Sequence, residues 1–209
     1  MKNLFKLVAA LALIAACVAV VILAVNVKNS AGLLDEGRLR AILDSAEYPS
    51  DAAETAVVSA ASIVGKVHYF WGGKSFCIGP DPEWGEEKTV TSEGHSTSSM
   101  VRPFGLDCSG LVTWAYIQAG YSMDEIGNGT WNQWQKSEEI SKSELRPGDL
   151  GFQNRYPGSS GNHVGIFIGY YNEKPVFIHC ISSHDNVVVT TGDGIFNYYR
   201  RPLLSSAAD

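Results

Sequence analysis

The chain has 209 residues, of which 45% are hydrophobic, 18% charged and 11% aromatic. These values are typical of a globular protein and exclude a chain that is disordered throughout. The length is enough for one well-buried domain plus an appendage. A formal net charge of -6, without any cluster of lysine and arginine, argues against a protein that binds nucleic acid.

The first residues have the pattern of a membrane segment. Lys2 and Lys6 precede an almost purely apolar run from Leu7 to Val25. About 19 residues rising ~1.5 Å each cover the hydrocarbon core of a bilayer, so we expect residues 1–27 to form an uncleaved anchor. A cleaved signal peptide and a lipoprotein processed at Cys17 remain open as alternatives. Basic residues flank both sides of the run, so the positive-inside rule leaves its orientation undecided.

Residues 28–50 are expected to form a linker with a short helical piece from 33 to 46. A capping box at Asp51 and Glu54 then opens a helix with an apolar stripe, which we expect to end at Gly65. Residues 74–103, called the insertion below, are rich in glycine, serine, threonine and charge. Loops of this length are uncommon in compact domains unless they are functional or disordered. The insertion is interpreted as a cleft wall or lid, with a passive surface loop as the alternative.

The second half of the chain predicts one central helix followed by strands. The helix runs from Cys108 to about Ala119, is apolar nearly all round and should therefore be buried. A hairpin is expected around Asn172 and Glu173. Helices followed by consecutive antiparallel strands indicate the α+β class. The expected strands cover residues 149–152, 163–171, 175–182, 186–191 and 198–202.

Cys108 is the candidate nucleophile. It follows Asp107 and precedes Ser109 and Gly110, residue types that favour turns and helix N-caps. A helix N-terminus stabilises a thiolate and offers free N–H groups as an oxyanion hole. Gly110 is expected to leave room for a substrate to approach the backbone. The alternative is a buried structural cysteine, which is the commoner role.

His163 is the candidate general base, because it opens a strand beside glycines and should be accessible. His179 is the candidate for a third group that orients it. The two positions lie near the matched ends of one hairpin, and their even separation is compatible with one face, directly opposite or diagonal. His184 competes for the third role, although it falls in a turn; His68 and His95 have no partner pattern.

The number of cysteines and the lack of ligand-binding motifs argue against a disulfide scaffold, a metal site and a cofactor site. Four cysteines are too few for a disulfide scaffold, and a nucleophilic Cys108 must stay free. Cys77 and Cys180 could pair, but we favour two small buried hydrophobic residues. No metal-ligand spacing and no glycine-rich phosphate loop is present, so we expect neither a metal nor a cofactor.

Five motifs in order give a family resemblance. The stretch from Val57 to Pro202 resembles the NlpC/P60 cysteine peptidases, bacterial cell-wall hydrolases with a papain-like core. The matching pieces are Tyr69-x-Trp71-Gly72-Gly73, Asp107-Cys108-Ser109-Gly110-Leu111-Val112, Leu145-Arg146-Pro147-Gly148-Asp149-Leu150, His163-Val164-Gly165-Ile166 and Phe177-Ile178-His179. We therefore expect residues 51–204 to form the catalytic domain, with a central antiparallel sheet and the nucleophile at the N-terminus of a packed helix.

The resemblance implies a nucleophile at Cys108, a base at His163 and a polar orienting group at His179. It also implies that Tyr69, Asp107 and Ser109 line the cleft near the amino end of the bound peptide. The implied substrate is the stem peptide of peptidoglycan, cut after the D-γ-glutamyl residue. Peptidoglycan lies outside the cell, so we expect the catalytic domain there, either anchored or secreted.

The insertion is a departure from the family, which usually has a short link at this point. Trp84 offers a flat apolar surface, and we expect it to contact a sugar or peptide of the substrate. Fold does not fix substrate, so an amidase or acyl transferase on the same thiol fold stays open, as does a non-catalytic protein that binds the cell wall.

Overall fold

The computed structural model describes residues 32–158 and 161–204. The predicted membrane segment 1–27 lies outside these residues. Within the described ranges, no helix is long and apolar enough to cross a bilayer. The compact unit that carries the candidate site begins at Leu34, ahead of the boundary expected at residue 51.

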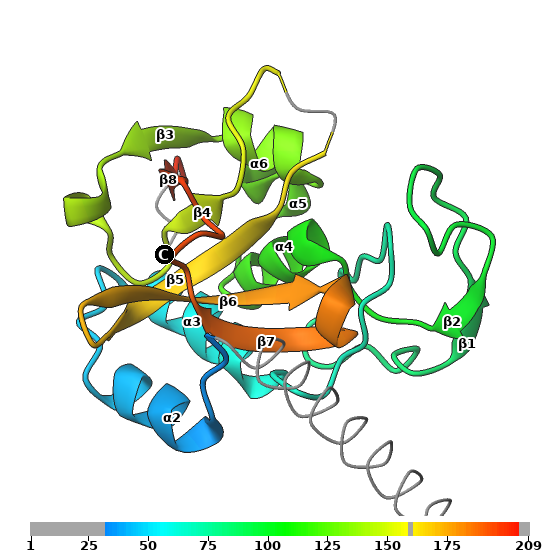
Figure 1. The fold of residues 1–209 in the computed structure, drawn as a ribbon, viewed down its shortest axis with the longest axis horizontal. Coiled ribbons are helices and arrows are strands. Elements are labelled where there is room, and N and C mark those ends of the chain that lie inside the picture. The colour runs from blue at the N-terminus through cyan, green and yellow to red at the C-terminus, as the bar shows by residue number, and fades with distance from the viewer. Residues whose placement is uncertain (1–31, 159–160, 205–209) are drawn as a thin grey trace, which may run out of the picture. The chain divides into compact units, whose positions relative to one another are not determined.

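The centre of this unit is a six-stranded sheet in which all paired strands are antiparallel (Figure 1). The expected α+β class is therefore confirmed. Across the sheet the strands are β3 (Ser137–Ile140), β8 (Tyr198–Pro202), β4 (Leu150–Phe152), β5 (Val164–Tyr171), β6 (Lys174–Ile181) and β7 (Asn186–Thr191).

The β5–β6 hairpin turns at the predicted residues. Asn172 and Glu173 have φ values of 49° and 63°, the left-handed pair that a two-residue hairpin turn requires. The register places Ile166 opposite Ile178, and both side chains enter the main core. The next pair, Phe167 and Phe177, points to the other face and joins a smaller cluster.

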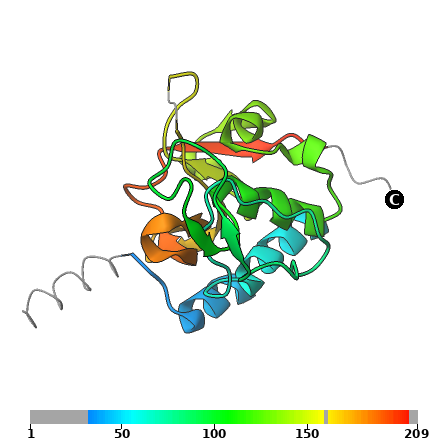
Figure 2. The same ribbon diagram turned by 90° about the vertical axis from the view of Figure 1, so that its right-hand side faces the viewer.

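Three helices cover the main-core face of the sheet: α2 (Glu36–Asp44), α3 (Asp51–Ser62) and α4 (Cys108–Gln118). Figure 2 shows them as one layer, coloured blue, cyan and green. All residues of α4 from Cys108 to Ile117 are buried, as its apolar composition predicts. α2 buries Leu39 and Ile42 in the same core, so this part of the expected linker belongs to the compact unit.

The start and end of α3 differ from the sequence prediction. Ser50, and not Asp51, is the N-cap, because its side chain accepts the N–H of Ala53. The helix ends at Ser62, and the expected stop at Gly65 follows a further turn. The remaining short elements are α5 (Met123–Ile126), α6 (Thr130–Gln135), η1 (Lys142–Glu144) and η2 (Ser182–His184).

The insertion forms its own small antiparallel sheet from β1 (Glu87–Thr89) and β2 (Val101–Pro103), on the right of Figure 1. Aromatic contacts pack it against the rest of the domain. Trp84 meets Trp114 of α4 edge-on, with ring centroids 5.4 Å apart. His95 stacks on Trp71, with ring centroids 5.0 Å apart.

Candidate active site

Cys108 is the first residue of α4, and its helix start is fixed by Asp107. The side chain of Asp107 accepts the N–H of Gly110 at 2.7 Å, the usual N-cap hydrogen bond. Cys108 is only 6% exposed. The thiol therefore lies at a helix N-terminus, as predicted.

Three glycines allow backbone segments to meet closely at the start of α4. A Cβ on Gly110 would lie 2.2 Å from the carbonyl oxygen of Gly73. A Cβ on Gly73 would lie 2.2 Å from the oxygen of Gly105, and one on Gly105 would lie 2.0 Å from that of His68. Only glycine permits such approaches. The space at Gly110 is therefore filled by the chain itself, which corrects the expectation that a substrate uses it.

The thiol lies against the segment that leads into β5. Its Sγ is 4.0 Å from the carbonyl oxygen of Asn162, the residue before His163. The side chain of Asn162 accepts the backbone N–H groups of Asn154 and His163, both at 2.9 Å. Asn162 therefore fixes the backbone that carries the candidate base next to the candidate nucleophile.

His163, His179 and Thr190 form a hydrogen-bonded chain. His163 Nε2 lies 2.8 Å from His179 Nδ1, and His179 Nε2 lies 2.8 Å from Thr190 Oγ1. Continuing the register of β5 and β6 sets Gly165 opposite His179, so the two histidines are diagonal neighbours on one face. This was one of the two arrangements that the sequence left open.

Phe196 packs against both imidazoles. Its ring is stacked on His163, with centroids 5.6 Å apart, and meets His179 edge-on at 5.4 Å. Gly165 makes this possible, because a Cβ there would lie 2.8 Å from Phe196 Cζ. His179 is 1% exposed, so burial, together with the neighbouring His163, lowers its pKa well below the ordinary value.

Burial favours the neutral forms of the nucleophile and the base. Burial, followed by the nearby Asp107 carboxylate, raises the pKa of the Cys108 thiol to about 12. The backbone N–H groups of Val164 and Ser109 oppose this rise. Burial lowers the pKa of His163 to about 4, although Asp107 opposes this shift. The expected lowering of the thiol pKa by the helix start is therefore outweighed by desolvation.

The other predicted cleft residues surround the nucleophile. Tyr69 pairs with Leu106 in an isolated bridge, is 9% exposed, and has its pKa raised by burial and by the nearby Cys108. Asp107 and Ser109 flank Cys108 and are joined by a hydrogen bond of 2.8 Å. The ammonium group of Lys74 bonds to both of them, a contact that the sequence analysis did not predict.

Trp84 lies in the contact between the insertion and α4. Its ring is partly buried against the main core, and its buried Nε1 has no hydrogen-bond partner among the described residues. His95 lies closer to the candidate site, with its ring 5.7 Å from that of Tyr69. The insertion thus approaches the cleft residues through His95.

The competing histidines and the other cysteines lie outside the chain of hydrogen bonds described above. His68 Nδ1 is 3.0 Å from Asp185 Oδ2, and His184 Nδ1 is 3.1 Å from the hydroxyl of Ser183. Cys180 is buried and free, as expected, whereas Cys77 is free but exposed. Within the described part of the chain, no group of three or more histidine, cysteine, aspartate or glutamate residues could hold a metal ion.

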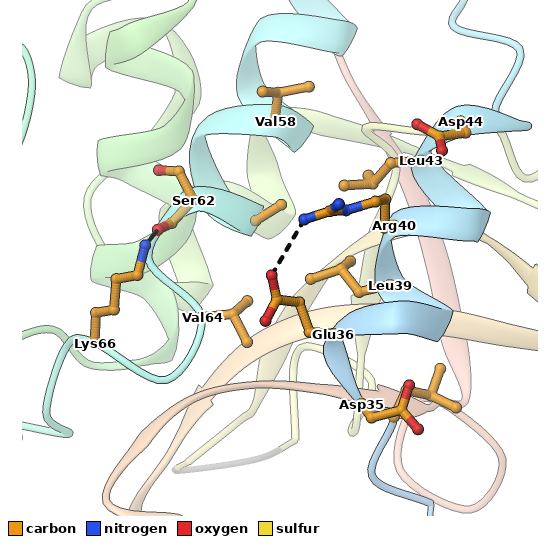
Figure 3. Close-up of a pocket in the computed structure, with 12 residues that line it drawn as sticks. Asp35, Glu36, Leu39, Arg40, Leu43, Asp44, Val58, Ser62, Val64 and Lys66 are labelled. Atoms are coloured by element: carbon orange, nitrogen blue, oxygen red, sulfur yellow. Dashed lines mark hydrogen bonds and ion pairs between the residues drawn. The ribbon is translucent and has the colours of Figure 1, made fainter.

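A groove of about 440 Å³ between α2 and α3 is separate from these residues (Figure 3). Its apolar lining includes Leu39, Leu43 and Val58, and an ion pair of 3.3 Å between Glu36 and Arg40 crosses its surface. No cysteine or histidine lines it, so it offers neither the nucleophile nor the base.

The sequence analysis did not identify four residues of the candidate site: Lys74, Asn162, Thr190 and Phe196. Asn162 directly precedes His163 and is a residue type that fixes turns, so this signal was present. Lys74 directly follows the Trp71-Gly72-Gly73 motif, a signal that was also present. Thr190 and Phe196 reach the site through tertiary packing, which the neighbouring sequence does not indicate.

Comparison with known proteins identifies the family of the chain. Residues 66–200 match the NlpC/P60 family. The chain is 33% identical over 120 residues to the peptidoglycan DL-endopeptidase CwlO of Bacillus licheniformis, covering 57% of this chain and 21% of CwlO. It is 34% identical over 106 residues to the murein DD-endopeptidase/LD-carboxypeptidase MepS of Escherichia coli K12, covering 49% of this chain and 52% of MepS.

The chain thus spans about half the length of MepS and about a fifth of that of CwlO. Among solved structures, the peptidoglycan hydrolase RipB of Mycobacterium tuberculosis superposes with a TM-score of 0.52 at 24% identity. That match covers 82% of this chain and 69% of RipB, and at this identity it shows a shared fold. The matched profile covers more than half of the chain, which therefore belongs to the NlpC/P60 family.

Proposed function

We propose that this protein is a cysteine endopeptidase that cleaves the stem peptide of peptidoglycan after the D-γ-glutamyl residue. The observation that carries the proposal is the hydrogen-bonded chain from His163 through His179 to Thr190, together with the thiol of Cys108, which lies 4.0 Å from the carbonyl oxygen of the residue before His163. The name of the relative CwlO supports a DL-endopeptidase, whereas the name of MepS denotes a different pair of bonds. The bond cleaved is therefore part of the proposal.

In the first step, His163 removes the thiol proton. If His163 donates its Nε2–H to His179 Nδ1, then His179 donates to Thr190 and the Nδ1 of His163 is free to accept a proton. As the sulfur of Cys108 attacks the peptide carbonyl carbon, that proton moves to Nδ1. The negative charge passes to the carbonyl oxygen, which the N–H groups at the start of α4 stabilise.

In the second step, the peptide C–N bond breaks. The imidazolium of His163 gives its proton to the leaving amine, and the acyl group stays on Cys108 as a thioester. His163 then accepts a proton from a water molecule, which attacks the thioester and releases the carboxylic acid. The nucleophile and base return to their neutral forms, which burial of both groups favours.

The test is digestion of purified sacculi, with the new termini identified by mass spectrometry. New amino groups on diaminopimelate or lysine are the expected result for the full-length protein. Cys108→Ala removes the nucleophile and little volume, so it should abolish these products while the fold is kept. Cys77→Ala is the matched control, because Cys77 is exposed and free and should not affect cleavage.

The alternatives give different products in the same digestion. Lactyl ends on muramic acid would indicate an amidase, and transfer of the acyl group to an added amine would indicate an acyl transferase. Binding to sacculi without any product would indicate a non-catalytic protein of the cell wall. Substantial turnover by a folded Cys108→Ala protein would rule out the thiol mechanism.

We further propose that residues 1–27 hold the catalytic domain at the outer face of the cytoplasmic membrane, where peptidoglycan is in reach. The apolar run of about 19 residues is long enough for a single span. Cell fractionation should find the full-length protein with the membrane. A shortened soluble product would indicate a cleaved signal, and incorporation of labelled fatty acid that depends on Cys17 would indicate a lipoprotein.

A further inference from the structure

Lys74 places a positive charge against the two residues that flank the candidate nucleophile. Its ammonium lies 2.5 Å from Asp107 Oδ2, 3.0 Å from Ser109 Oγ and 3.4 Å from the carbonyl oxygen of Gly73. The side chain of Lys74 is 18% exposed and that of Asp107 is 8% exposed. This ion pair is therefore largely withdrawn from water, unlike an ordinary surface pair.

Most acceptor positions of this cluster are already used within the chain. Asp107 Oδ1 accepts the hydroxyl of Ser109 and the N–H of Gly110, while Oδ2 accepts from Lys74. An ammonium group has three donors, and Asp107, Ser109 and Gly73 take all three from Lys74. The carboxylate next to Cys108 is thus paired with a positive charge, and three of its acceptor positions are occupied.

This arrangement has a consequence for the amino end of a bound peptide. The family resemblance implies that Tyr69, Asp107 and Ser109 line the cleft near that end. We take this placement as part of the proposed function, and the inference rests on it. A free amino group carries a positive charge and needs a carboxylate or hydroxyl acceptor. Here it would find Lys74 in that place, and would lie beside a like charge in a poorly solvated site.

We propose that Lys74 is a specificity-determining residue that selects stem peptides with an acylated amino end. An amide at that position carries no charge, so it lies beside Lys74 without repulsion. In intact peptidoglycan the stem peptide is joined to the glycan through such an amide, whereas released peptides carry a free ammonium. The enzyme should therefore act on the intact wall in preference to released peptides.

The experiment compares two synthetic tripeptides, L-Ala-γ-D-Glu-L-Lys with a free amino end and the same peptide acetylated at that end. The full-length protein should cleave the acetylated peptide with a kcat/KM at least about tenfold higher. Lys74→Met keeps much of the side-chain length but removes the charge, and should reduce that ratio about tenfold or more. Lys74→Arg keeps the charge and should retain the preference.

A matched control comes from the same insertion. Lys88 pairs with Glu83 at 2.8 Å, away from Cys108, so Lys88→Met should leave the ratio unchanged. A second readout needs no turnover. Calorimetry measures how Cys108→Ala protein binds the dipeptide L-Ala-D-Glu with a free amino end and the same dipeptide acetylated at that end. Adding Lys74→Met should tighten binding of the free-amine dipeptide and leave the acetylated one unchanged.

The inference is overturned if the unaltered protein prefers the free amine in either assay. It is also overturned if Lys74→Met leaves the preference unchanged in both assays. If the protein cleaves neither tripeptide nor sacculi, the proposed function fails, and the dipeptide binding alone then decides whether Lys74 excludes an ammonium.

Discussion

The ring of Phe196 lies nearly parallel to the imidazole of His163, with centroids 5.6 Å apart and planes inclined at 14°. Because the same ring also meets His179 edge-on, one side chain restricts the rotation of both histidines. Phe196 itself is 2% exposed and belongs to the cluster that contains Phe177. The orientation of the proposed base thus depends on packing as well as on hydrogen bonds.

Phe196→Leu should therefore lower kcat more than it alters KM. We expect a loss of about tenfold, because His163 gains rotational freedom, and a destabilisation of about 1–2 kcal/mol from the smaller side chain. Steady-state kinetics and urea unfolding measure the two effects. Phe167→Leu is the matched control, since Phe167 is buried in the same cluster but its ring contacts Tyr170 and Phe177. Unchanged kcat in Phe196→Leu would contradict this role.

Thr190 should matter through its hydroxyl group. Thr190→Val keeps the shape but removes the partner of His179 Nε2, so the histidine chain loses its terminal acceptor. We expect kcat to fall about three- to tenfold, matching the ~0.5–1.5 kcal/mol of one hydrogen bond. Thr190→Ser should restore most of the activity. Equal kcat values for the valine and serine variants would show that the hydroxyl is not used.

Cys108 and His163 should behave as one unit. Each alanine variant alone should lose nearly all activity, and the double variant should be no worse, because groups that act together are not additive. His179→Ala should retain more, since orienting a base contributes less than supplying it. Single-turnover assays on sacculi measure these variants together with His184→Ala. A damaging His184→Ala together with a mild His179→Ala would reverse the assignment of the third group.

The pH dependence follows from burial of both groups. Alkylation of Cys108 by iodoacetamide should rise steadily from pH 6 to pH 9, because the pKa of the thiol is raised to about 12 and more thiolate forms as pH rises. Activity should fall only as pH drops through about 4, where His163 becomes protonated and no longer accepts a proton. Peptide mapping in a Cys77→Ala background follows Cys108 alone. A rate independent of pH from 5 to 8 would indicate a preformed ion pair instead.

Trp84→Ala separates two roles of the insertion. The T-shaped contact with Trp114 predicts a loss of stability of about 2–3 kcal/mol, somewhat less than for a fully buried tryptophan. A substrate-binding role predicts in addition a higher KM on polymeric wall, with little change of kcat on a short stem peptide. Thermal unfolding and kinetics on both substrates distinguish the two roles. His95→Ala should leave kcat nearly unchanged, because His95 touches Tyr69 and Trp71 but neither histidine of the chain.

The sequence was most informative where chemistry and local structure coincide. Cys108 after Asp107 predicts both a helix start and a nucleophile, and the two turn residues Asn172 and Glu173 fix the hairpin that carries both histidines. These features depend on residues that are neighbours in the chain, so the sequence alone is enough to predict them. The predicted helix and hairpin are accordingly found within one or two residues of their expected bounds.

The remaining features depend on contacts between distant segments. Lys74 meets Asp107 across 33 positions of sequence, and Phe196 meets His163 across a similar span. Lys74 directly follows the Trp71-Gly72-Gly73 motif, but its contact with Asp107 depends on the fold, and no motif lies beside Phe196. The pKa of Cys108 is likewise set mainly by burial. A sequence pattern for a helix start does not indicate how deeply the residue is buried.

The close backbone contacts of Gly73, Gly105 and Gly110 affect which substitutions a genetic screen for loss of activity would find. Any side chain at these positions would push the backbone segments apart. The helix that carries Cys108 would then lose the backbone contacts that hold its N-terminus in place. A screen for inactive variants would therefore return these glycines together with Cys108 and His163. Melting temperature distinguishes the two groups, because glycine variants should unfold early, whereas Cys108→Ala should melt like the unaltered protein.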